Sequence, residues 1–113
     1  MQVAPEQERV LKSLNAFKAI AKQALLAAVT TKDPEYWQRH AESRRLIYKN
    51  LITWVEMDGV ETACSRALQE YRQVLQGKES SPEQAGRLEA LEGFLSLCGF
   101  DERTIKQSQR SMY

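Results

Sequence analysis

The sequence predicts an all-α fold: an antiparallel bundle of four main helices with a short fifth helix at the C-terminus. Three observations lead to this prediction. Apolar residues recur at alternating spacings of three and four over long segments, as on the buried face of a helix. Capping residues with a neighbouring proline or glycine mark most of the breaks between those segments. No segment shows the sustained alternation of β-branched residues that is typical of a strand.

The first predicted helix begins at about Glu6, because Pro5 suits a first helical position, and it runs to the break at "TTKDPE". Its apolar stripe consists of Val10, Leu14, Phe17, Ala21, Ala24 and Ala28, with Leu11, Ile20, Leu25 and Val29 beside it. A helix of about 25 residues would be roughly 40 Å long and would overhang shorter neighbours. We therefore expect exposed apolar surface on this helix and a homodimer that forms through it. The alternative is that the second to fourth helices cover the whole stripe, helped by Trp37 and Trp54.

The second predicted helix follows directly. Asp33 can cap it, Pro34 takes its first position, and we expect it to end near Met57. Its apolar stripe consists of Trp37, Ala41, Tyr48, Leu51 and Val55, flanked by Ile47, Ile52 and Trp54. This pattern predicts that the middle of the helix lies in the core.

The third predicted helix begins where Asp58 and Glu61 have the spacing of a capping box, with Gly59 between them at the turn. Its end is marked by Gly77. Its apolar positions are Val60, Cys64, Ala67, Tyr71 and Val74.

The fourth predicted helix starts at Ser81 and Pro82, which repeat the signal of a cap followed by proline. It ends at Gly99, and its buried positions are Leu88, Leu91, Leu95 and Cys98. Gly86 and Gly93 interrupt it, and each costs roughly 1 kcal/mol relative to alanine. They either weaken the helix or mark the close approach of another helix.

The last corner, "FLSLCGFDERTIKQSQ", has the outline of a DNA-reading helix-turn-helix. Asp101 caps the short fifth helix of this corner, and the candidate recognition residues are Arg103, Lys106 and Arg110. However, Leu95 occupies a position where a small residue is preferred. We expect a structural corner of the bundle.

Composition indicates a globular protein without favouring any class of partner. The 113 residues are one domain by length, spanning residues 1–113, and they carry 16 basic and 15 acidic side chains. The start of the chain lacks a basic leader before an apolar segment, and the most apolar run, "ALLAAV", is too short to span a bilayer. We expect a cytoplasmic protein with no membrane partner.

The two cysteines, Cys64 and Cys98, lie far apart in the sequence and lack the spacing of metal ligands. We interpret them as reduced, buried thiols of a cytosolic-type protein, with a disulfide between helices as the alternative.

Residues for catalysis are scarce. His40 has no carboxylate three or four positions away to orient it as a base. Two of the acids around Gly59 are explained by helix capping, and their spacing is not that of a calcium loop. The chain contains no glycine-rich phosphate loop. We therefore expect no enzyme activity, no metal site and no cofactor.

A basic cluster with interleaved aromatic residues, "RHAESRRLIYKN" and the residues just before it, is the strongest candidate surface. Arginines beside aromatic rings can stack on nucleic-acid bases or on a protein partner. The alternative is a solvated helix face whose aromatic rings turn into the core. The candidate residues are Trp37, Arg39, His40, Arg44, Arg45, Tyr48 and Lys49.

The sequence favours a non-enzymatic helical interaction module, a small adaptor or assembly subunit that binds a protein partner or itself. The alternative is a nucleic-acid-binding protein that uses the basic cluster, the C-terminal corner or both. Nucleic acid is the less favoured partner because the overall charge is only +1.

Overall fold

The computed structural model describes residues 5–77 and 81–100. Over these ranges the chain is helical and contains no strand. Its elements in order are α1 (Pro5–Ala27), the 3-10 helix η1 (Ala28–Thr30), α2 (Pro34–Asp58), α3 (Val60–Gln76) and α4 (Pro82–Leu97). The predicted all-α class and the four main helices are confirmed, whereas the predicted fifth helix lies outside the described residues.

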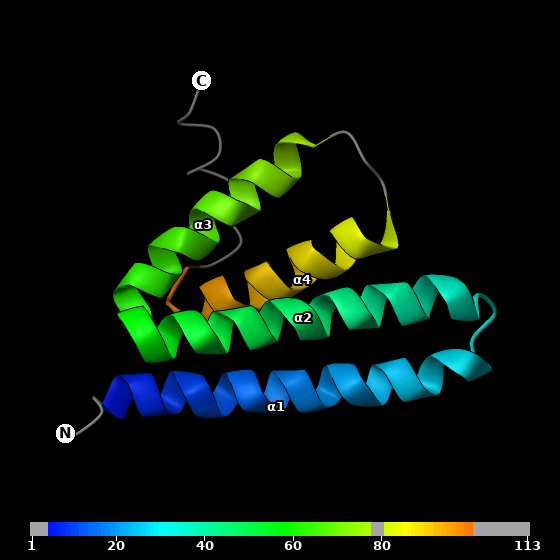
Figure 1. Cartoon of the computed structure of the whole chain (residues 1–113), viewed down its shortest axis with the longest axis horizontal. Helices are drawn as coiled ribbons and strands as arrows, with labels where there is room; N and C mark the ends of the chain where they lie inside the picture. The colour runs from blue at the N-terminus through cyan, green and yellow to red at the C-terminus, as the bar shows by residue number, and fades with distance from the viewer. Residues whose placement is uncertain (1–4, 78–80, 101–113) are drawn as a thin grey trace.

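The helix α2 lies at the centre of the fold. Figure 1 shows α1 antiparallel to it along one side, with α3 and α4 on the other side. The start of α4 lies against α2 at Gly86 and His40, and Gly93 lies near Tyr48 further along, so α4 runs in the same direction as α2. The fold therefore has three layers. The helix α2 forms the middle layer, α1 lies on one side of it, and the pair formed by α3 and α4 lies on the other.

Of the three side-chain caps predicted within the described residues, two are confirmed and one is wrong, although α3 begins where expected. The Asp33 carboxylate accepts a hydrogen bond from the backbone N–H of Tyr36 at 3.3 Å, and the Ser81 hydroxyl accepts one from that of Gln84 at 3.1 Å. Asp58, by contrast, does not cap α3 but is the last residue of α2. Gly59 alone joins the two helices at a φ of 88°, a conformation that favours glycine, and leaves no room for a capping box.

The core contains the predicted stripes of the helices. Its largest fully buried side chains are Phe94, Leu14, Leu51, Leu91, Leu95, Val10 and Val55. One predicted member is misplaced, because Trp37 is 44% exposed. The start of α4 lies beside Arg39, whose Nε donates a hydrogen bond to Glu83, and Trp37 precedes this contact. None of the helices within residues 5–77 and 81–100 combines the length and apolar character that crossing a membrane requires.

Gly86 marks a close helix crossing. A Cβ atom at this position would overlap the backbone carbonyl oxygen of His40 and would lie 3.0 Å from Cβ of Ser43. Only glycine lets the α4 backbone reach α2 at this distance. Gly93 is different, because its nearest neighbours would be 3.8 Å from an added Cβ. The interpretation of a close approach therefore holds at Gly86 and not at Gly93.

The expectation of reduced cysteines is wrong. Cys64 in α3 and Cys98 at the end of α4 form a disulfide, with their Cα atoms 6.5 Å apart. The sequence pattern places both on apolar stripes but does not show that the two helix ends meet. The structure therefore agrees with the alternative interpretation, a disulfide between two helices. Tyr71 adds a second link between α3 and α4, since its hydroxyl donates a hydrogen bond to Glu92 at 2.9 Å.

Candidate functional site

The predicted basic cluster of α2 divides between two sides of the helix. Arg39, His40 and Arg44 face α4, where acidic side chains meet them. Arg45 and Lys49 are exposed on another side and form no ion pair with the residues that the structure describes. These five residues, adjacent in the sequence, therefore do not form one surface.

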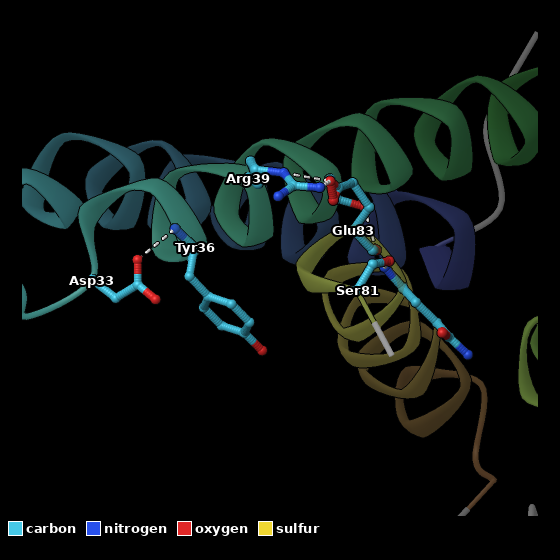
Figure 2. Close-up of polar contacts among 7 residues, drawn as sticks. Asp33, Tyr36, Arg39, Ser81 and Glu83 are labelled. Carbon is cyan, nitrogen blue, oxygen red and sulfur yellow. Dashed lines mark hydrogen bonds and ion pairs between the residues drawn. The ribbon is translucent and has the colours of Figure 1, made fainter. Parts of the chain in front are cut away.

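Arg39 attaches the start of α4 to α2. Its Nε donates a hydrogen bond to the Glu83 carboxylate at 2.6 Å, and the two side chains point toward one another in Figure 2. Beside this pair, the Ser43 hydroxyl donates to the backbone carbonyl of Glu83 at 2.7 Å. The ring of Tyr36 points away from the pair. The Arg39 guanidinium is therefore engaged within the chain, although about half of the side chain is exposed.

His40 and Arg44 share the second acid of α4, Glu89. Nε2 of His40 lies 3.0 Å from one carboxylate oxygen, and Nε of Arg44 lies 3.9 Å from the other. Both side chains are largely buried, with 10% and 14% of their surface exposed. Arg44 also lies over the ring of Tyr48, 5.9 Å from its centroid, and Tyr48 is itself buried. These contacts build the α2–α4 interface.

The two acids of α4 are what the sequence reasoning missed. His40 has no carboxylate partner along its own helix, but Glu89 reaches it from α4. A signal exists in the sequence of α4, because Glu83 and Glu89 lie three residues before and after Gly86. Residues at that spacing share a helix face with the glycine, so a close crossing at Gly86 brings both acids to the neighbouring helix.

A second feature is an apolar surface that helical spacing from Phe17 and His40 places on the side of α1 and α2 toward α4. We call it the Trp37 surface; its large exposed side chains are Ile20, which is 53% exposed, and Trp37, which is 44% exposed. The rings of Phe17 and Tyr48 lie 5.6 Å apart and set the register of the antiparallel pair. Ile20 follows Phe17 by about one helical turn and therefore lies near the level of Arg44. The same register places Ala28 opposite Trp37.

Aromatic rings support Trp37 from its own helix. Its ring is edge-on to Tyr36 at 4.9 Å and to His40 at 5.3 Å between centroids. His40 is in turn fixed by Glu89. Trp37 is therefore a large apolar side chain that is both exposed and held in place, as an anchor residue at an interface should be.

The remaining candidates add little chemistry. Among residues 5–77 and 81–100, no three His, Cys, Asp or Glu side chains are grouped as a metal site requires. The candidate recognition residues Arg103, Lys106 and Arg110 lie outside the described residues. The corner before them is tight, since the backbone N–H of Phe100 donates to the carbonyl of Leu95 at 3.0 Å.

No protein-family model, no curated protein and no solved structure matches this chain.

Proposed function

We propose that the chain is a non-enzymatic helical interaction module that assembles with a second copy of itself through the Trp37 surface. The observation that carries the proposal is the exposure of Ile20 and Trp37, two large apolar side chains. Both lie three residues from a side chain that faces α4, Phe17 or His40, so helical spacing places them on the same side of the α1–α2 layer. Burying a side chain of this size against a partner stabilises a complex by roughly 1.5–3 kcal/mol. The stripe of α1 itself does not overhang as expected, because Val10, Leu14 and Ala21 are fully buried and α2, with 25 residues, is longer than α1, with 23. The proposed contact therefore uses Ile20 at the edge of the stripe.

A second copy fits this surface for an electrostatic reason. The charged residues next to it, among them Arg44 and His40, already have Glu89 as their partner within the chain. Two copies related by a two-fold axis place identical patches against each other, so unpaired like charges would repel. Paired charges do not create that repulsion. In addition, Ala24 and Ala27 are small residues of α1 near Ile20 and allow a second helix to approach closely.

The nucleic-acid alternative has less support. Phosphate binding needs cations that are free to contact phosphate. Three of the basic residues in the α2 cluster, Arg39, His40 and Arg44, contact acids of α4 instead.

Sedimentation equilibrium over a range of protein concentrations tests the proposal. We expect the wild-type chain to approach twice its monomer mass of 13.0 kDa as the concentration rises. Ile20→Asp places a charge in the proposed contact and should leave a monomer. Met57→Asp is the matched control, since Met57 is 78% exposed at the other end of α2 and should leave association unchanged. A wild-type monomer at all concentrations would rule out the dimer.

A further inference from the structure

Four cations gather on the side of the α1–α2 layer that faces away from α4. Lys18 and Lys22 lie four residues apart on α1, and Arg45 and Lys49 lie four apart on α2, so each pair shares a helix face. Lys22, Arg45 and Lys49 are exposed and Lys18 is half-buried. We call these four residues the basic face.

The register of the two helices brings the pairs together. Phe17 and Arg44 lie toward α4, because Phe17 adjoins Gly93 and Arg44 adjoins Glu89. A step of one residue turns a helix by about 100°, which carries Lys18 and Arg45 across the line of contact between the helices to the opposite side. The antiparallel register set by Phe17 and Tyr48 places both pairs at the same level along the layer.

The charge of this face is not neutralised. None of the four cations forms an ion pair with a residue that the structure describes. Residues 9–32 contain five basic and no acidic side chains, so α1 contributes no acid here. Glu42 is exposed three residues before Arg45 and shares its side of α2, so the four cations and this acid leave a net charge of +3 on the face. The chain as a whole is nearly neutral, but the fold directs Glu83 and Glu89 toward the opposite side of α2 and leaves this side basic.

Large aliphatic side chains accompany these cations. Leu26 follows Lys22 by four residues and is 68% exposed, and Val29 follows by seven and is 62% exposed. On α2, Leu46 precedes Lys49 by three residues and is 57% exposed. By the same helical spacing Leu26 and Leu46 flank the basic face, and Val29 follows Leu26 in the 3-10 helix η1 at the end of α1.

We propose that the basic face, together with Leu26, Val29 and Leu46, binds the surface of an anionic lipid bilayer. Lysine and arginine are attracted to anionic headgroups, while aliphatic side chains beside them enter the boundary between headgroups and acyl chains. A protein bound in this way lies on the membrane surface, so no membrane-crossing helix is needed. It departs from the expectation of no membrane partner, which rested on overall charge and on the lack of a spanning segment.

The aliphatic residues favour lipid over nucleic acid as the occupant. Phosphate groups of a nucleic acid attract the cations but offer nothing apolar to Leu26 and Val29. A bilayer surface can bind both kinds of side chain, because its headgroups attract the cations and its acyl boundary accommodates the aliphatic side chains. A second copy of the chain is disfavoured here, because a two-fold axis would bring identical cations together. The basic face and the Trp37 surface lie on opposite sides of the α1–α2 layer, so this inference stands independently of the proposed dimer.

Vesicle co-sedimentation with the full chain tests the inference. We expect binding to phosphatidylcholine vesicles in which about a third of the lipid is phosphatidylserine, and none to pure phosphatidylcholine. Arg45→Gln with Lys49→Gln should weaken the partition coefficient about twenty-fivefold, since each cation near the surface contributes about fivefold. Arg9→Gln with Arg87→Gln removes the same charge from exposed positions elsewhere and should have little effect.

A second pair of variants separates lipid from nucleic acid. Leu26→Ser should weaken vesicle binding roughly tenfold. Met57→Ser changes an equally exposed side chain outside the face and should not weaken it. The inference is overturned if the chain does not bind anionic vesicles. It is also overturned if duplex DNA is bound more tightly than the vesicles and Leu26→Ser leaves vesicle binding unchanged, because the face would then be a phosphate-binding surface.

Discussion

Gly86 and Gly93 lie in the same helix seven residues apart, and substituting each with alanine should change stability in opposite directions. Alanine is better than glycine within a helix by roughly 1 kcal/mol, and this gain applies at both positions. At Gly86 the new Cβ would overlap the His40 carbonyl oxygen and lie 3.3 Å from the Arg44 backbone nitrogen. These are backbone atoms of a helix and cannot turn aside, so overpacking should exceed the gain.

We expect Gly86→Ala to lower the free energy of unfolding by a net value of about 1–3 kcal/mol. Gly93→Ala should raise it by up to about 1 kcal/mol, because its Cβ would meet Phe17 and Tyr48 at an ordinary contact distance of 3.8 Å. Urea unfolding followed by circular dichroism measures both changes. If Gly86→Ala is as stable as Gly93→Ala, the close crossing of α2 and α4 is not present and the reasoning fails.

Three further predictions concern the core and its links. Leu51→Ala should destabilise by roughly 2–5 kcal/mol in the same urea assay, since Leu51 is fully buried; an unchanged midpoint would place it outside the core. Reduction of the disulfide, which joins positions 34 residues apart, should lower stability by about 4 kcal/mol at most through loop entropy. A non-reducing gel in which the oxidised and reduced chains migrate alike, with free thiols on both cysteines, would argue against the bond. Tyr71→Phe should cost about 1 kcal/mol by removing the hydrogen bond to Glu92, and equal midpoints would show that this bond contributes nothing.

Local chemistry explains why much of the fold could be predicted from the sequence. The caps at Asp33 and Ser81 act on backbone groups three residues away, so the sequence around them is sufficient. The buried stripe of α2 follows from helical spacing alone, as the full burial of Leu51 and Val55 demonstrates. Asp58 is the exception, because the capping-box spacing was present but α2 continued through it.

Contacts between distant segments explain what could not be predicted. His40 and Glu89 are far apart in the sequence, and so are Cys64 and Cys98. Neither pairing follows from a period along one helix. The basic cluster of α2 was visible as composition, but only the position of α4 determines which of its cations are paired. Net charge likewise conceals that the cations on one side of α2 contact acids of α4, whereas Arg45 and Lys49 form no ion pair with the described residues.

The central claim is that adjacent cations of α2 have different roles, one structural and one available to a partner. Arg44→Gln and Arg45→Gln make the same chemical change at neighbouring positions, and urea unfolding of the two variants tests the claim directly. Arg44 is 14% exposed, packs over the ring of Tyr48 and lies 3.9 Å from Glu89, so the loss of its packing and of this ion pair should lower the free energy of unfolding by roughly 1–2 kcal/mol. Arg45 is exposed, and its loss should change stability by less than about 0.5 kcal/mol. Equal midpoints for the two variants, or a larger loss for Arg45→Gln, would contradict the claim.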